Sequence, residues 1–115
     1  KNRGSFPMKQ VLFAPDVEED LFQLIRILVE KHYLSTFDYA VSYVEELVGY
    51  INEHIHTYPH KDVPKHFYRY GSDAKYISYN RSNHTTWYII FEERQEAYLV
   101  TQITNNHVSG QYFNQ

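Results

Sequence analysis

Residues 85–107 read TTWYIIFEERQEAYLVTQITNNH, and this stretch decides the fold of the chain. Two apolar runs, rich in aromatic and β-branched residues, flank a charged turn at residues 92–96. Such runs are typical of two strands joined by a short connection. The second run ends on the amide side chains of Asn105 and Asn106 and the imidazole of His107. We therefore expect a β-hairpin whose last strand brings polar side chains to the edge of a sheet, where binding and chemistry are common.

Two helices are predicted ahead of this hairpin, because apolar side chains recur at spacings of three and four along residues 16–31 and 36–55. The first stripe comprises Val17, Leu21, Leu24, Ile25 and Leu28, and the second comprises Ala40, Tyr43, Val44, Leu47, Val48, Ile51 and Ile55. Asp16 is the predicted N-cap of the first helix, and Ser35 or Thr36 that of the second. The short link between the two helices predicts an antiparallel helical hairpin lying on a sheet.

Strands are predicted where short apolar runs, or runs with a period of two, end at turn residues. The predicted strands are residues 8–13, 66–70, 74–80, 85–92 and 97–104. The links between the last three have hairpin length, so these strands form an antiparallel meander, with Trp87 in the core. The predicted fold class is α+β, a two-layer sandwich of an N-terminal strand, an antiparallel helical hairpin and an antiparallel β-meander.

Length and composition bound the organisation of the chain. Its 115 residues, 43% of them hydrophobic, predict one domain over residues 8–115. Residues 1–7 precede the only methionine, Met8, and show no periodicity, so we expect an artificial remnant followed by the natural start. The absence of cysteine excludes disulfides and thiolate metal sites. A cytoplasmic protein is predicted, because no apolar run approaches the roughly 18 residues of a membrane span and no secretory signal is visible.

The net charge of −3 argues against a general nucleic-acid binder, but the charge is unevenly distributed. Residues 16–53 hold nine acidic side chains against two basic ones. Residues 54–91 hold Lys61, Lys65, Arg69, Lys75 and Arg81 against Asp62 and Asp73, together with five histidines. This mildly basic half predicts a surface that faces a polyanion, and ordinary solvated charge is the alternative.

The predicted order of elements resembles that of the RelE/ParE family of bacterial toxins, and so do three short segments, FYRYG at 67–71, TWY at 86–88 and NNH at 105–107. The resemblance covers roughly residues 8–113. It implies the toxic half of a type II toxin-antitoxin pair, held inactive by a cognate antitoxin. RelE-like members are implied to cut mRNA in the ribosomal A site without a cofactor. ParE-like members are implied to lack this nuclease chemistry and to poison DNA gyrase, and the fold alone does not choose between the two.

A metal-independent endoribonuclease moves a proton off the ribose 2′-hydroxyl, offsets charge on the phosphate and protonates the leaving oxygen. The resemblance implies His107 and Tyr112 as acid and base, and Arg69, on a predicted strand, as the phosphate clamp. The further residues predicted to bind substrate are Lys65, Arg81, Asn105 and Asn106. Many family members carry an arginine on the strand that residues 85–91 form, and this chain has none there. That departure favours the gyrase alternative, and the acidity favours an inactive, toxin-like binding module.

Each candidate residue also has a structural alternative. Asn105 or Asn106 could cap the backbone next to His107, and Tyr112 could pack on a neighbour. Arg69 could pair with Asp73 or stack on an adjacent tyrosine.

Three nearby histidines, His54, His56 and His60, invite a zinc or nickel interpretation. On a helix the first two point about 200° apart, and Pro59 interrupts the geometry before the third. No native metal site is therefore predicted.

Overall fold

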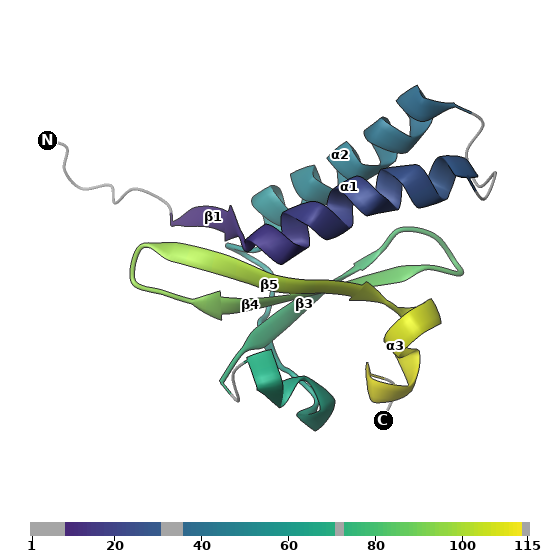
Figure 1. Cartoon of the computed structure of the whole chain (residues 1–115). Coiled ribbons are helices and arrows are strands. Elements are labelled where there is room, and N and C mark those ends of the chain that lie inside the picture. Colours follow the sequence, from purple (N-terminus) through teal and green to yellow (C-terminus); the bar gives the residue numbers. More distant parts are fainter. Residues whose placement is uncertain (1–8, 31–35, 71–72, 114–115) are drawn as a thin grey trace, which may run out of the picture.

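The computed structural model describes residues 9–30, 36–70 and 73–113. Its elements are β1 (Gln10–Phe13), α1 (Pro15–Glu30), α2 (Phe37–His54), β2 (Lys61–Asp62), the 3-10 helix η1 (Lys65–Tyr70), β3 (Lys75–Asn80), β4 (Thr86–Glu93), β5 (Ala97–Asn105) and α3 (Asn106–Phe113). The strands form one sheet in the order β1-β5-β4-β3-β2. Helices α1 and α2 cover one face of the sheet, and α3 lies on the opposite face (Figure 1). The predicted α+β class and order of elements are confirmed.

The predicted meander is present, since β3, β4 and β5 pair antiparallel in sequence. Strand β1 joins the other side of β5 in a parallel pairing, from Gln10 opposite Ala97 to Phe13 opposite Val100. The ladder between β4 and β5 shifts register between Ile90 and Phe91. A bulge of this kind adds twist and keeps apolar side chains directed at the core on both sides of the irregularity.

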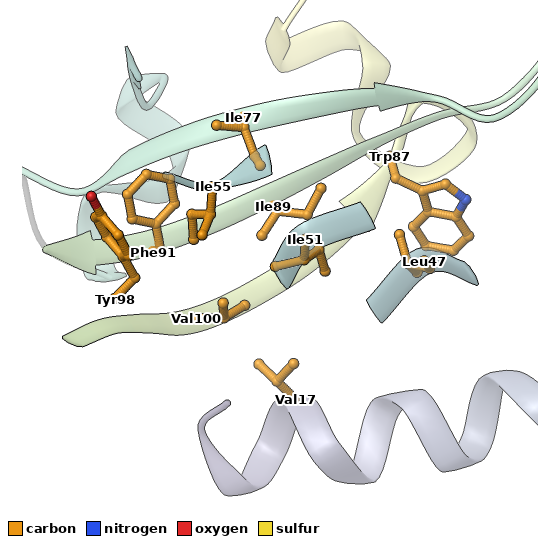
Figure 2. Packing of buried hydrophobic residues seen from close by; sticks show 10 residues of the cluster. All are labelled: Val17, Leu47, Ile51, Ile55, Ile77, Trp87, Ile89, Phe91, Tyr98 and Val100. Carbon is orange, nitrogen blue, oxygen red and sulfur yellow. The ribbon is translucent and has the colours of Figure 1, made fainter. Parts of the chain in front are cut away.

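The main core lies between the sheet and the helical hairpin. Its buried residues are Val17, Leu47, Ile51, Ile55, Ile77, Trp87, Ile89, Phe91, Tyr98 and Val100. Figure 2 shows α2 directing Leu47 and Ile51 at the sheet, while Val17 of α1 approaches the same layer from the other helix. The predicted core position of Trp87 is confirmed, and its indole N–H donates to the Tyr43 hydroxyl at 3.1 Å. Burial of each large apolar side chain in this layer contributes about 1.5 to 3 kcal/mol.

A second, smaller core fixes η1 and α3 to the opposite face of the sheet. Val63, Phe67, Ala74 and Ile90 are its buried members, with Tyr76, Tyr112 and Phe113 packed against them. The Phe113 ring stacks on Tyr88 with centroids 3.8 Å apart. Because β4 contributes to both cores, its five central residues are all buried. The uninterrupted apolar run in the middle of β4 follows from this burial on both faces.

The prediction of a strand at residues 66–70 is wrong, because this segment is the 3-10 helix η1. Its first turn is closed by the Phe67 N–H, which donates to the Pro64 carbonyl at 2.9 Å, and the Phe67 side chain enters the second core. One buried aromatic anchors a short turn in place of an alternating strand. The family-like segment that contains Arg69 therefore lies on a helix, as far as the described residues extend.

The helix boundaries also differ in part from the predictions. Helix α1 begins at Pro15, one residue before the predicted N-cap Asp16, and the N–H groups of Val17 and Glu18 donate to the Ala14 carbonyl. Proline suits the first helical position because its φ is already helical, and Asp16 instead adds charge in the first turn. Thr36 caps α2 as predicted, since its hydroxyl accepts from the Tyr39 N–H at 3.2 Å. The alternative cap Ser35, the predicted helix end near residue 31 and the remnant at residues 1–7 fall outside the described residues.

Helix α3, which follows β5 directly, has no counterpart among the predicted elements. Across the described ranges, no helix is both long enough and apolar enough to cross a bilayer. The cytoplasmic location stays a prediction.

Candidate functional site

The predicted polar cluster lies where β5 turns into α3. The Asn105 side-chain oxygen accepts from the N–H groups of His107 at 2.9 Å and Val108 at 3.1 Å, so Asn105 is the N-cap of α3. The Asn106 side chain accepts from the Thr86 N–H at 2.9 Å and donates to the His84 carbonyl at 3.1 Å. The structural alternative, in which Asn105 caps the backbone next to His107, is thus confirmed. Both amide side chains form hydrogen bonds with main-chain groups around the start of α3. Substrate contacts by either residue stay a prediction.

His107 occupies the first turn of α3 and is exposed. Its Nε2 lies 3.0 Å from the Thr85 hydroxyl, in the connection between β3 and β4. His107 therefore lies at the opposite end of α3 from Tyr112. A proton exchanged at this histidine would be held next to the Thr85 hydroxyl.

Tyr112 lies in the last turn of α3 and contacts η1. Its ring stacks on the exposed His66 imidazole, with centroids 3.7 Å apart and planes 6° apart, and meets Phe67 edge-on at 6.0 Å. Tyr112, which is predicted from the sequence to act as an acid or base, therefore contacts His66. The sequence alone places His66 only among the histidines of the mildly basic half. A signal was available, since His66 stands between two predicted cations in the short segment after Pro64.

Those two cations, Lys65 and Arg69, are both exposed on η1. Side chains three residues apart eclipse one another in a 3-10 helix. His66 and Arg69 therefore lie on the same side of η1, which brings the predicted phosphate clamp into the neighbourhood of the stacked His66 and Tyr112 rings. We call His66, Arg69, Tyr112 and the adjacent Lys65 the η1–α3 cluster; the period of three places Lys65 in line with Tyr68, on another side of η1.

Arg81 lies apart from this cluster, on the side of the sheet that α2 covers. Its guanidinium is 2.7 Å from the Glu46 carboxylate and lies over the Tyr43 ring, with 4.6 Å between the guanidinium carbon and the ring centroid. These contacts anchor the start of the connection after β3 to α2. This position does not support the prediction that Arg81 binds substrate.

Ion pairs at the ends of the strands set the local electrostatics. Lys75 of β3 pairs with Asp62 of β2, and this hydrogen bond raises the pKa of Lys75. Burial raises the pKa of Tyr76, and the neighbouring Tyr88 phenol adds to the shift, so Tyr76 stays protonated beside Phe113. The Lys75 charge is thus neutralised locally by Asp62.

The three histidines of the metal interpretation make separate contacts. His54 packs against Tyr50 and Tyr58, His60 bonds the Ile55 carbonyl at 2.7 Å, and His56 meets Tyr98 edge-on. Within the described ranges, no three His, Asp or Glu side chains gather as a metal site.

Comparisons with protein-family models, curated proteins and solved structures give no match to this chain. Any functional assignment must therefore come from the chain itself. Chemically, the η1–α3 cluster combines an arginine and a lysine, which bind phosphate, with an imidazole and a phenol, which exchange protons.

Proposed function

We propose that this protein is a RelE/ParE-like toxin of a type II toxin-antitoxin pair that cuts ribosome-bound mRNA in the cytoplasm. The observation that carries the proposal is the stack of the exposed His66 on Tyr112, on the side of η1 that the period of three assigns to Arg69, in an α+β fold whose element order resembles that of the family. The family motifs in the sequence add support. Neither feature depends on the net charge of the chain.

In this proposal the cluster performs transesterification of the RNA backbone. The ribose 2′-oxygen attacks the adjacent phosphorus and gives up its proton to a base, while the 5′-oxygen of the next nucleotide leaves and takes up a proton. The products are a 2′,3′-cyclic phosphate and a 5′-hydroxyl. Arg69 stabilises the extra charge on the phosphate, Lys65 adds positive potential, and the His66 and Tyr112 pair exchanges the protons. The ribosome positions the mRNA strand on this face.

The proposal is tested by inducing residues 8–115 in a bacterium without the antitoxin. Growth should arrest, and pulse labelling should show an early loss of translation with mRNA cut at defined codon positions. A variant carrying Arg69→Ala and Tyr112→Phe, expressed to the same level, is the control and should permit growth. Continued growth with the unsubstituted chain, at verified expression of the folded protein, would leave only the toxin-like binding module.

A second candidate function is gyrase poisoning. It is favoured by β4, whose residues Thr86–Glu93 include no lysine or arginine. It is also favoured by the position of His107, which contacts Thr85 at a distance from Tyr112 along α3. In this case growth arrest should be accompanied by an early DNA-damage response while mRNA stays intact, and the control variant should remain toxic.

The helical hairpin offers the proposed antitoxin a contact surface. A groove of about 260 Å³ runs between α1 and α2, lined by Phe13, Glu18, Leu21, Phe22, Ile25, Val44 and Val48. Phe22 is 68% exposed at this groove, so its ring adds apolar surface that a partner can cover. An amphipathic segment fits such a groove. A second segment of the antitoxin would cover the cations of η1.

If a short open reading frame lies next to the gene for this chain, its product is the first partner to test. This product should restore growth on co-expression and bury roughly 1,000 Å² or more in the complex. Binding should weaken with salt if the antitoxin neutralises Lys65 and Arg69. An affinity that does not change with ionic strength would show that the antitoxin leaves η1 uncovered.

A further inference from the structure

Four aromatic rings contact one another at the C-terminal end of α2, and we call them the aromatic row. Tyr79 of β3 stacks on Tyr50 of α2, with centroids 3.9 Å apart and planes 16° apart. His54 follows at 4.4 Å from Tyr50 with its plane tilted by 53°, and Tyr58 follows at 4.4 Å from His54 with a tilt of 32°. The row bends at His54, because Tyr58 also meets Tyr50 edge-on at 5.7 Å. Tyr50 and His54 are neighbours because residues four apart lie on one side of a helix, and Tyr58 extends the row beyond the helix end. The row runs from the main core to the surface, where Tyr58 is 39% exposed.

A pocket of about 500 Å³ opens beside this row. It is lined by Tyr50, Tyr58, Pro59, Lys61, Ile77, Ser78, Tyr79 and Asn80. The volume is within the range of small-molecule sites. Tyr50 and Tyr79 pack against the main core on the side of the sheet covered by α2, whereas the η1–α3 cluster lies on the other side. The pocket is therefore separate from the site of the proposed cleavage.

The pocket lies along an edge of the sheet, which raises the question of strand addition. Strand β2 pairs only with Lys75 and Tyr76, so within the described residues the rest of β3 has no strand on that side. The Arg81 N–H donates to the Thr85 carbonyl at 2.9 Å, which fixes the alternation of the antiparallel ladder. By that alternation the main-chain groups of Ser78 point away from β4, toward the pocket.

The Ser78 carbonyl, which points out from this edge, already accepts a hydrogen bond. The Tyr50 hydroxyl donates to the Ser78 carbonyl at 3.1 Å. Burial raises the pKa of Tyr50, and the neighbouring Tyr58 phenol adds to the shift, so the hydroxyl keeps its proton at physiological pH. An incoming strand would have to displace the Tyr50 ring, which is stacked on Tyr79 and in contact with His54 and Tyr58. Side chains that cover an edge in this way oppose strand pairing, so the pocket favours a flat ligand over an extended peptide.

We infer that this pocket binds a nucleotide, with the base stacked against the Tyr58 end of the aromatic row and the phosphate next to Lys61. The Lys61 side chain is exposed at the mouth of the pocket and can reach an anion. The Asn80 side-chain oxygen accepts from the Thr86 hydroxyl at 2.8 Å, so its amide NH₂ is the group that can read a base edge. The shared chemistry is a nucleobase that carries a phosphate, either free or as one unit of a single strand.

The charge of the protein sets how this ligand is held. A chain with a net charge of −3 and one lysine at the pocket gains little from general attraction to a polyanion. Stacking must therefore supply most of the affinity, and the dependence on salt must be shallow. For a single phosphate contact on a single strand, the slope of log K against log salt concentration is about −0.7.

The test is titration of the full chain with 5′-AMP, 5′-UMP, the RNA hexamers A6 and U6, and an abasic hexamer of the same charge. Binding is followed by ¹H–¹⁵N spectra of the backbone amides. Base-containing ligands should shift amides around Tyr58, Lys61 and Ser78, and the abasic hexamer should not. Binding of the mononucleotides at full affinity identifies a free nucleotide as the ligand, whereas binding of the hexamers alone identifies a strand.

Substitutions at the pocket sharpen this test. Tyr58→Ala should weaken binding by about 5- to 100-fold, while Tyr58→Phe should retain it. Lys61→Ala should remove the salt dependence. Tyr39→Ala is the matched control, because Tyr39 is also an exposed tyrosine but lies in the first turn of α2, at the opposite end of the helix from the pocket, and binding should be unchanged.

Two results would overturn the inference. One is equal binding of the abasic and base-containing hexamers, or binding of none of the ligands. The other is that an extended peptide binds and nucleotides do not, and that the peptide binds more tightly to the Tyr50→Phe variant. This variant lacks the hydroxyl that bonds the Ser78 carbonyl. The test needs no ribosome and no cleavage, so the pocket and the proposed nuclease can each fail without the other.

Discussion

The His66 imidazole lies flat on the Tyr112 phenol ring, with 3.7 Å between centroids and 6° between planes. The stack joins η1 to α3, two elements that contact through the second core on the face of the sheet opposite the helical hairpin. It brings two groups that exchange protons onto the side of η1 that also carries Arg69. Their mutual position gives the proposed nuclease a defined set of residues to test.

Arg69→Ala should slow cleavage without unfolding the protein. If the guanidinium stabilises charge on the scissile phosphate, its loss should reduce the single-turnover rate by about 30- to 1,000-fold. The measurement is single-turnover cleavage of ribosome-bound mRNA, with thermal melts alongside. Arg94→Ala is the control, since Arg94 is an exposed arginine of the turn between β4 and β5 that pairs with Glu92. Equal rates for the two variants would remove Arg69 from the site.

His66→Gln and His107→Gln, compared side by side, should reveal which histidine exchanges a proton. Glutamine retains hydrogen bonding but does not titrate, so loss of the working imidazole should lower the rate by roughly 100-fold and flatten its pH dependence between about pH 5 and 8. We expect this effect for His66, which touches Tyr112. The effect at His107 instead would place proton transfer next to Thr85, and near wild-type rates for both would favour gyrase poisoning.

Asn105→Ala should loosen α3, because it removes the acceptor for the N–H groups of His107 and Val108. Loss of such an N-cap costs about 0.5 to 2 kcal/mol of stability. Amide hydrogen exchange along α3 should increase, and the Tyr112 ring should lose its fixed position on His66. Asn105→Asp keeps a capping oxygen and is the control. Unchanged exchange in the alanine variant would mean that the Asn106 hydrogen bonds and the packing of Tyr112 and Phe113 hold the helix without the cap.

Glu93→Gln should change the pH dependence of stability. Its hydrogen bond with Lys9, 2.6 Å long, lowers the pKa of the folded Glu93 carboxyl below the ordinary value of about 4.3. The stabilisation is therefore complete above that value and is lost as the pH falls through the lowered pKa. Melting temperatures of wild type and variant should differ by at most about 5 °C at pH 7, because the pair is exposed, and should converge near pH 3. If the two melting temperatures still differ at low pH, the difference has a cause other than the Lys9–Glu93 pair.

Ile89→Val should lower the free energy of unfolding by about 0.5 to 1.5 kcal/mol, because Ile89 is fully buried between α2 and the sheet. Val108→Ala is the matched control, since Val108 is 75% exposed and should change stability by less than about 0.5 kcal/mol. Chemical denaturation measures both. A similar loss from the two substitutions would contradict the layer arrangement.

The helical hairpin and the meander could be predicted from the sequence because their signals are local and repeated. Thr36 is a strong capping residue, and the stripe that includes Leu47 and Ile51 is continuous over the length of α2. The apolar runs of β4 and β5 likewise define strands within about one residue. These elements agree with the structure because propensity, periodicity and burial all favour the same conformation.

The site was less accessible from the sequence because its positions depend on packing between distant segments. The residues around Arg69 have the composition of a strand, but the burial of Phe67 turns them into a 3-10 helix. The stack between His66 and Tyr112 joins residues 46 positions apart, and no local pattern reports it. Asn105 was correctly predicted as a capping residue in one alternative, but the helix that it caps was not. Arg81 was selected for its charge, which said nothing about its partner Glu46 on α2, a helix on the opposite side of the sheet from the η1–α3 cluster.

The parallel pairing of β1 with β5 has a consequence for the synthesis of the chain. Gln10 leaves the ribosome 87 positions ahead of its partner Ala97. The sheet therefore cannot be completed until β5 has been synthesised, and non-local pairing of this kind slows folding. If the protein is the toxin that we propose, its own topology delays the active fold until β5 is free to pair. That delay gives a co-translated antitoxin time to be present when the last strand takes its place.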